Sequence, residues 1–144
     1  MRHRSGCENT AKKAQKDQGL NATPAFTELA STDPAASRRF LQKVFGWSFE
    51  SVKMPQGEYL SYQTGGGGRG GIRPTQPNEP AGSTNYIRVS DLDGALQRVK
   101  AAGGEIVLAR VDVPKMGSFF WFRIPGGPVM ACWQDAPDLP RGKE

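Results

Sequence analysis

The sequence predicts an α+β domain built from two tandem βαβββ units, and two observations carry this prediction. First, 18 of the 144 residues are Gly and 11 are Pro, a composition that favours short elements joined by turns over long helices. Second, patterns typical of one strand, one helix and three strands follow one another in each half of the chain. A shift of about 60 residues lays residues 26–29 on 86–89 and Asp33 on Asp93.

The first unit begins with a short strand over residues 26–30. Asp33 is placed to cap a helix that starts at Pro34, and Gly46 is placed to end it. One face of this helix is expected to be buried, and it carries Ala36, Phe40, Leu41 and Val44. Three strands then follow, over residues 47–52, 58–63 and 70–73.

The second unit repeats this order after a Pro-rich linker. It opens with a strand over residues 86–89, and Ser90 and Asp91 form the cap of the next helix. The apolar stripe of that helix consists of Leu92, Leu96 and Val99. Its three last strands are expected over residues 105–111, 118–123 and 128–134.

The chain is expected to hold one domain between two tails. By composition, residues 1–23 form a disordered basic leader and residues 136–144 a C-terminal tail. The domain over residues 24–135 divides into a first module, a linker and a second module, which span residues 24–74, 75–83 and 84–135.

Most of the net charge of +5 lies in the leader, which holds five Lys and Arg residues against two acidic ones. The domain itself is therefore only weakly basic, and it shows no basic stripe on a structured element. We expect no nucleic-acid partner. The chain also lacks the apolar run of a signal peptide or a membrane span, and its two cysteines cannot form a disulfide framework. A reduced, cytoplasmic location without membrane association is the expectation.

The single histidine, His3, lies in the leader. The predicted domain therefore contains no imidazole that could bind a metal ion or act as a base. This excludes every mechanism that needs a histidine in the core. Without a histidine to activate it, Cys132 is expected to be a small buried apolar residue rather than a nucleophile.

Several segments together resemble the vicinal oxygen chelate superfamily, the group of glyoxalases, bleomycin resistance proteins and dioxygenases. They are residues 28–34 leading into 44–49, then 70–72, 86–93 running to 102–106, and 122–127 leading to 133–134. This resemblance covers nearly all of residues 24–135. It implies that the two modules curl into an open barrel around a cleft, and that the protein forms a homodimer.

The resemblance also implies where metal ligands would stand. Metal-dependent members bind the ion through His and Glu side chains on equivalent strands of the two modules. Here the positions on the opening strands fall at Phe26 and near residues 84–86, and those on the closing strands fall near Ile72 and at Trp133 or Gln134. None of these side chains coordinates a cation as His or a carboxylate would. We therefore expect no metal ion and no cofactor.

Strand alternation suggests which residues face the cleft. Phe26 and Glu28 share one face of the first strand, and Tyr86 and Arg88 share the equivalent face of the second module. Glu28 opposite Arg88 predicts a charge pair. A structural ion pair is the favoured interpretation, while a polar anchor for a ligand, with Glu28 as a general base, is the alternative.

Aromatic residues are the second feature of the predicted strands. Tyr62 and Trp133 are the preferred pocket candidates, because each lies near a strand end beside polar residues; rings that only fill the core are the alternative. The Gly-rich run over residues 65–71 lacks a following Lys and helix, so it predicts a hairpin rather than a phosphate site, and a lid is its other possible role.

These observations predict a metal-free protein that binds an aromatic or amphipathic small molecule in an aromatic cleft. The ligand-binding residues are expected to be Phe26, Glu28, Tyr62, Tyr86, Arg88 and Trp133. One rival is a lyase or isomerase that acts on a small oxygenated metabolite with Glu28 as the catalytic base. Another is a partner subunit whose barrel has no ligand.

Overall fold

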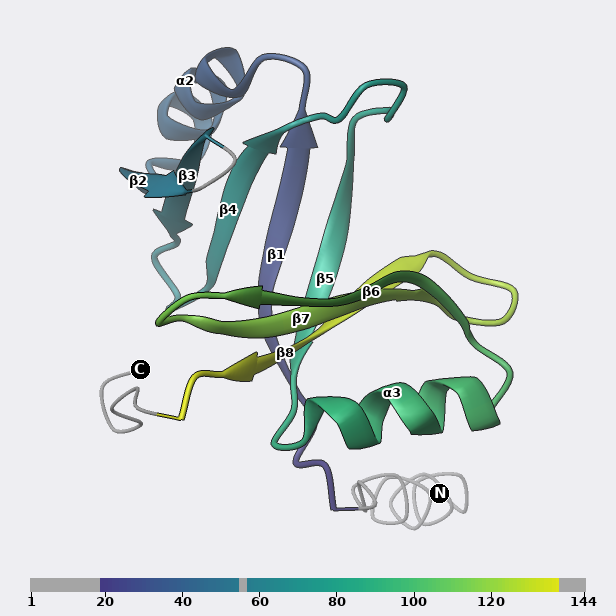
Figure 1. Cartoon of the computed structure of the whole chain (residues 1–144). Helices are drawn as coiled ribbons and strands as arrows, with labels where there is room; N and C mark the ends of the chain where they lie inside the picture. Colours follow the sequence, from purple (N-terminus) through teal and green to yellow (C-terminus); the bar gives the residue numbers. More distant parts are fainter. Residues whose placement is uncertain (1–18, 55–56, 138–144) are drawn as a thin grey trace, which may run out of the picture.

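In the computed structural model, residues 19–54 and 57–137 form eight strands and two helices (Figure 1). The first module comprises β1 (Thr23–Ser31), α2 (Pro34–Phe45), β2 (Ser48–Met54), β3 (Gly57–Gln63) and β4 (Arg69–Pro74). The second comprises β5 (Gly82–Arg88), α3 (Leu92–Ala101), β6 (Glu105–Val113), β7 (Gly117–Arg123) and β8 (Val129–Asp135). The predicted order of two βαβββ units is confirmed.

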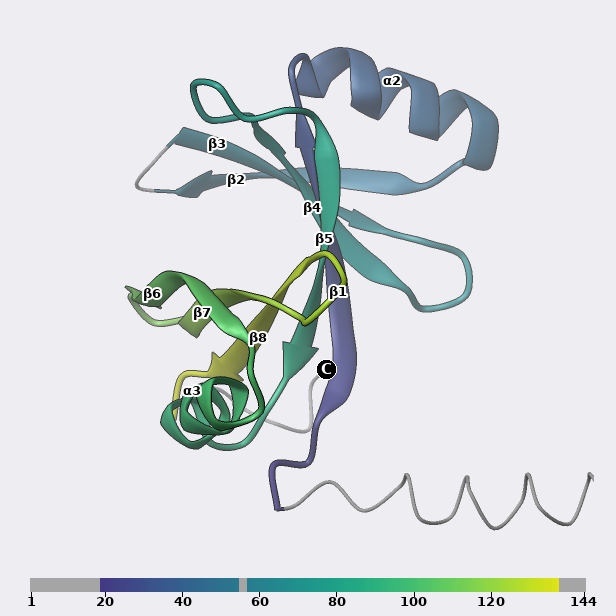
Figure 2. The same cartoon turned by 90° about the vertical axis from the view of Figure 1, so that its right-hand side faces the viewer.

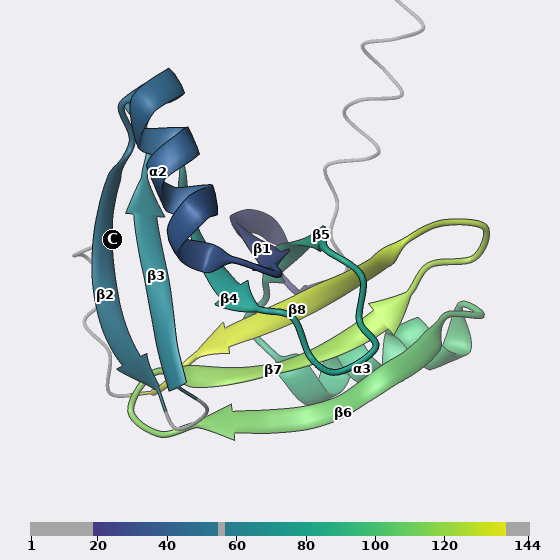
Figure 3. The same ribbon diagram turned by 90° about the horizontal axis from the view of Figure 1, so that it is seen from above.

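All eight strands belong to one sheet, in the order β2-β3-β4-β1-β5-β8-β7-β6. Within each module the opening strand runs parallel to the closing one, β1 beside β4 and β5 beside β8. Antiparallel β1 and β5 join the two modules at the centre of the sheet. Figure 3 shows the strands of the two modules set at a wide angle to each other, so that the sheet is curled and open. The α+β class is therefore confirmed.

The helix caps appear where the sequence places them. Asp33 Oδ1 accepts a hydrogen bond of 3.1 Å from the Ala36 N–H, and Gly46 ends α2 in a left-handed conformation with φ 72°. In the second module Asp91 is the N-cap of α3. Asp33 therefore corresponds to Asp91 and not to Asp93. At the helix caps, the shift that superposes the two modules is thus two residues smaller than the shift that aligns Asp33 with Asp93.

The boundaries of the leader and of the Gly-rich loop need correction. Residues 1–18 and 138–144 lie outside the described part of the chain, as do residues 55–56. Residues of the predicted leader nevertheless belong to the fold, because Thr23 begins β1 and Leu20 packs against the apolar cluster of the second module. Gly70 and Gly71 are buried residues of β4, as the strand predicted over residues 70–73 requires, so the hairpin loop is shorter than the Gly-rich run of residues 65–71.

Each module has an apolar cluster on the face of the sheet that bears its helix, called the outer face below. In the second module Phe120 and Leu92 are fully buried at the centre of the cluster. In the first module the cluster consists of Leu60, Tyr62 and Ile72, with Leu29, Leu41, Trp47 and Phe49 packed against it. Alternate residues of the same strands point to the opposite, inner face.

The largest difference from the sequence prediction concerns α2, for which the sequence predicts one buried face. Phe40 and Val44 are 61% and 53% exposed, and no residue of α2 is buried. Only Leu41 packs against the cluster of the first module. α3, by contrast, buries Leu92 and Ala95. Figure 2 shows α2 and α3 at opposite ends of the molecule.

Replacement of Phe120 by Ala is expected to lower the free energy of unfolding by about 3–5 kcal/mol, because a fully buried ring leaves a cavity. Urea denaturation followed by tryptophan fluorescence measures this loss. Val107→Ala on β6 is the control, since Val107 is 40% exposed and its truncation should cost less than about 0.5 kcal/mol. Similar losses for the two variants would contradict the assigned core.

Candidate ligand site on the inner face of the sheet

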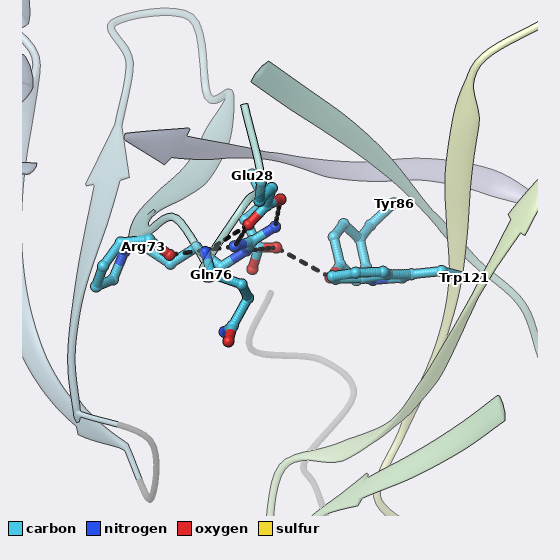
Figure 4. A network of polar contacts seen from close by, with 7 residues as sticks. Glu28, Arg73, Gln76, Tyr86 and Trp121 are labelled. Carbon is cyan, nitrogen blue, oxygen red and sulfur yellow. Dashed lines mark hydrogen bonds and ion pairs between the residues drawn. The ribbon is translucent and has the colours of Figure 1, made fainter. Parts of the chain in front are cut away.

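Glu28 is the centre of a polar network that joins the two modules (Figure 4). Its carboxylate is buried, and Oε1 accepts hydrogen bonds from Arg73 Nε at 3.0 Å and from the Tyr86 hydroxyl at 3.1 Å. The Tyr86 oxygen in turn accepts a hydrogen bond of 2.9 Å from Trp121 Nε1. The four residues come from β1, β4, β5 and β7.

Arg73 also ties the linker between the modules to this network. Its Nη1 and Nη2 donate to the two oxygens of Glu79 at 2.9 and 2.7 Å, which is a bidentate ion pair. The Gln76 N–H donates to the same carboxylate at 2.7 Å. The guanidinium carbon lies 5.3 Å from the centroid of a Trp121 ring, a cation–π distance. Arg73 thus pairs with two carboxylates and packs on an aromatic ring.

Two phenols beside Glu28 are kept protonated. Burial and the negative charge of Glu28 raise the pKa of Tyr86 and that of Tyr59 well above the ordinary value for tyrosine. Tyr59 comes from β3 and reaches Glu28 across Gly71, where a side chain would collide with its hydroxyl. Both phenols can therefore donate to the carboxylate but do not act as bases.

Aromatic rings pack against each other beside this network. The Phe26 and Tyr86 rings, which belong to directly opposite residues of β1 and β5, are stacked with centroids 4.5 Å apart. Trp133 meets Phe26 edge-on at 6.0 Å, and Phe119 lies nearly parallel to Trp133 at 6.2 Å. Phe26, Phe119 and Trp133 are half-buried, so parts of these rings remain accessible.

None of these three rings is among the residues that line the hollow found on the inner face, whereas the sequence predicts an aromatic-lined cleft. The hollow on the inner face lies over β2 and β3 and has a volume of about 300 Å³. Strand alternation places four of its lining residues on the same face as Tyr59. The residues that line it are Ser48, Phe49, Glu50, Ser61 and Gln63.

The predicted pairing of Glu28 with Arg88 is wrong. β1 and β5 run antiparallel, so that Thr84 lies opposite Glu28 while Thr23 lies opposite Arg88. Arg88 Nε instead forms an ion pair with Asp135 at 3.1 Å. The sequence comparison shifted one strand onto the other in the same direction and thus missed the antiparallel register.

Tyr62 is also misplaced by the sequence prediction. Its side chain points to the outer face, where it is 5% exposed and stacks on Trp47 with centroids 4.9 Å apart. Four predicted site residues do lie together, namely Phe26, Glu28, Tyr86 and Trp133. Arg73 was not among the candidates, although it follows Ile72 on its strand and must therefore face the other way.

The residues at the ligand positions implied by the resemblance do not fit a metal ion. Counted back from the helix caps, the opening-strand positions are Phe26 and Thr84. On β4, Ile72 points to the outer face, and the inward residue that follows it is Arg73, whose positive charge would repel a cation. Gln134 accepts from the Leu92 N–H at 2.7 Å at the start of α3. Within residues 19–54 and 57–137 there is no group of three or more His, Cys, Asp or Glu side chains arranged to bind a metal ion.

The fold and the inner-face site define an α+β protein of two βαβββ modules with an open curled sheet. The model of the Glyoxalase/Bleomycin resistance protein/Dioxygenase superfamily matches residues 23–128, and the chain belongs to this superfamily. Within residues 19–54 and 57–137, no helix has the length and apolar character needed to cross a membrane.

The curated relatives are longer proteins. The chain is 28% identical over 129 residues to the putative glyoxylase CFP32 of Mycobacterium tuberculosis, which covers 85% of this chain and 48% of that protein. It is 32% identical over 127 residues to the anthracycline biosynthesis protein DnrV of Streptomyces peucetius, with 77% and 46% covered. The chain thus spans about half the length of these relatives.

Solved structures share the fold at low sequence identity. Methylmalonyl-CoA epimerase from Mycobacterium tuberculosis superposes with a TM-score of 0.64 at 14% identity, over 83% of this chain and 91% of that one. A glyoxalase/bleomycin resistance protein/dioxygenase superfamily member from Vibrio splendidus gives 0.58 at 20% identity, over 81% and 99%. At these identities the likeness establishes the fold alone.

Replacement of Tyr86 by Phe is expected to lower the free energy of unfolding by about 1–3 kcal/mol, because it removes a donor to buried Glu28 and the acceptor for Trp121. Tyr62→Phe is the matched control, since the Tyr62 hydroxyl reaches only the Thr27 carbonyl, at 3.5 Å. Urea denaturation of both variants measures the difference. Equal losses would show that the network does not hold the modules together.

Stability is expected to fall steeply above pH 10, the ordinary pKa of the phenols. The raised pKa of Tyr59 and of Tyr86 in the folded protein means that the folded state holds these protons more tightly than the unfolded chain. Their contribution is therefore complete below pH 10 and is lost as the pH rises. Denaturation at pH 8 to 11 should show a shallower decline for the double variant Tyr59→Phe/Tyr86→Phe than for the wild type.

Proposed function

We propose that this protein binds a flat aromatic or amphipathic small molecule on the inner face of its sheet, without a metal ion. The observation that carries the proposal is the group of half-buried rings on the inner face, Phe26, Phe119 and Trp133, which pack against each other and keep part of their surface accessible. Accessible ring surface favours a ligand that stacks.

The polar groups of the site support the same proposal. Glu28, Tyr86 and Trp121 satisfy one another, and Trp133 Nε1 donates to Asp135 at 2.8 Å. A ligand that needs new hydrogen bonds at these atoms would have to break existing ones. Ring contacts, worth about 0.5–1.5 kcal/mol per pair beyond the area they bury, are the interaction that remains available.

Two relatives add support through their names. DnrV of Streptomyces peucetius and DauV of Streptomyces sp. (strain C5), 32% and 31% identical to this chain, are named anthracycline biosynthesis proteins. An anthracycline carries fused, flat rings, which is the ligand shape that the exposed rings of this site favour. A role in holding or sequestering such a compound agrees with the bleomycin resistance branch named in the superfamily.

A lyase or isomerase with Glu28 as the base is the second candidate, because Glu28 is the buried carboxylate at the centre of the polar network (Figure 4). Oε1 of this carboxylate already accepts from Arg73 and Tyr86, and Tyr59 adds a third donor. These donors use much of the hydrogen-bonding capacity of the carboxylate, so the geometry favours binding over this chemistry. The partner-subunit role would leave the rings without any ligand.

Proflavine, a flat tricyclic cation, is expected to bind saturably, to quench tryptophan fluorescence and to raise the melting temperature. At a hundredfold excess over its Kd the gain in stability should be about 2.7 kcal/mol. Phe119→Ala is expected to weaken binding about tenfold, which corresponds to about 1.4 kcal/mol of lost stacking. Phe45→Ala is the matched control, because this ring is 59% exposed on α2, away from the inner face.

The non-aromatic cation cyclohexylamine and the chelator EDTA complete the test. Cyclohexylamine should not quench the fluorescence, and EDTA should leave proflavine binding unchanged. No saturable binding, or equal weakening by the two alanine variants, would refute the aromatic site. A stoichiometric metal ion bound by core residues would refute the metal-free form of the proposal.

A further inference from the structure

The hollow over β2 and β3 is lined mainly by polar side chains. Its volume is about 300 Å³, and four of its five lining residues are polar, namely Ser48, Glu50, Ser61 and Gln63. Ser48 lies directly opposite Gln63 across the strand pair. Glu50 lies directly opposite Ser61 in the next pair on the same face. Because opposite side chains on one face of such a pair have Cβ atoms about 5 Å apart, the four residues form one compact group.

The polar atoms of this group are available to a ligand. In the part of the chain that the structure describes, the side chains of these four residues form no hydrogen bond or ion pair. Ser48, Glu50 and Gln63 are exposed. The carboxylate of Glu28 differs, because it already accepts from the Tyr86 hydroxyl and from Arg73. A polar ligand group can therefore bind in the hollow without breaking a hydrogen bond of the protein.

The hollow offers acceptors together with groups that both donate and accept. The carboxylate of Glu50 accepts through two oxygens, so it can bind two neighbouring hydroxyls of a ligand. The amide of Gln63 and the two serine hydroxyls can each donate and accept. A group with several hydroxyls can pair with all of these side chains. An apolar group in the same place would leave them without a partner.

Charge near the hollow favours a neutral ligand group. Among the described residues, Glu50 is the one charged residue that lines the hollow. Arg69 lies directly opposite Gln63 on β4 and is exposed. A side chain at Gly70 would meet the Tyr62 ring on the outer face, so Arg69 points to the inner face. The two charges oppose each other, and neither a cationic nor an anionic group is strongly preferred.

The strand register places the hollow within reach of the aromatic rings. Ser61 lies opposite Gly71 on β4, and Gly71 lies beside Glu28 on β1. Neighbouring strands are about 4.8 Å apart, so Ser61 is about 10 Å from Glu28 across the sheet. Phe26 lies two residues before Glu28 and shares its face. A ligand with an aromatic part and a polar part can thus contact the rings and the hollow together.

We propose that the hollow binds the sugar part of a neutral aromatic glycoside, with Glu50 and Gln63 as the main hydrogen-bonding residues. The aromatic part of the same molecule stacks on Phe26, Phe119 and Trp133. This inference rests on the proposed function, because those rings hold the flat part of the ligand. It adds a ligand class, since a flat molecule without hydroxyl groups would leave the polar hollow unused.

Calorimetric titration of the full chain with two related coumarins tests the proposal. One is 4-methylumbelliferyl β-glucoside, and the other is 7-methoxy-4-methylcoumarin, which has a methyl group in place of the sugar. The glucoside is expected to bind about tenfold more tightly, because its hydroxyls pair with the polar side chains of the hollow. Glu50→Ala should remove this difference and leave the affinity for the methoxycoumarin unchanged.

Glu58→Ala on β3 is the matched control. Glu58 is also an exposed carboxylate, but it lies two residues before Leu60 and therefore faces outward with that residue. This variant should bind the glucoside as the wild type does. Circular dichroism checks that both variants are folded.

Equal affinities of the wild type for the two coumarins would overturn the sugar site, as would equal effects of Glu50→Ala and Glu58→Ala. Titration of the same samples with proflavine, which carries no sugar, reports on the rings alone. Proflavine binding without a gain from the sugar would overturn this inference and leave the proposed function standing. If neither proflavine nor the glucoside binds, both are wrong.

Discussion

The buried carboxylate of Glu28 is the constraint around which the polar side chains of the inner face are arranged. A carboxylate away from water is tolerated only when charged and polar partners surround it, and here those partners come from both modules. Counted from the helix caps, Glu28 and Tyr86 are equivalent positions of the repeat. Two glutamates at these two positions would repel each other. Two tyrosines would leave Arg73 with Glu79 as its one carboxylate partner in the network. The two modules thus place a donor and an acceptor at equivalent positions, where identical residues could not pair.

Much of the fold could be predicted from local signals. Asp33 before Pro34, and Gly46 after the helix, define α2 because each acts on the few residues around it. Which side chains of β3 face inward was harder to predict from the sequence. The alternation of side chains along a strand shows that Tyr59 and Tyr62 point to opposite faces of the sheet, but not which of these faces is the inner one. The exposure of Phe40 was not predictable, because an apolar helical stripe looks the same whether it meets the domain's own core or another surface. The antiparallel register of β1 and β5 depends on contacts between residues that are far apart in the sequence. The prediction that Glu28 pairs with Arg88 was wrong for this reason.

The inner face carries aromatic and hydroxyl side chains at the positions where the resemblance implies metal ligands. On the opening strands β1 and β5 these residues are Phe26 and Thr84. Arg73 supplies a fixed positive charge on the closing strand of the first module, and the two phenols near Glu28 remain donors. The polar groups of the site are thereby hydrogen-bonded to one another and bordered by aromatic rings.

The ion pair between Arg73 and Glu79 makes the linker part of this site as well as a connection between modules. Glu79 holds the guanidinium of Arg73 from the side of the linker, and Glu28 holds it from β1. A change of the linker at Glu79 would therefore leave Arg73 with one carboxylate partner and alter the position of a charged side chain on the inner face of the sheet.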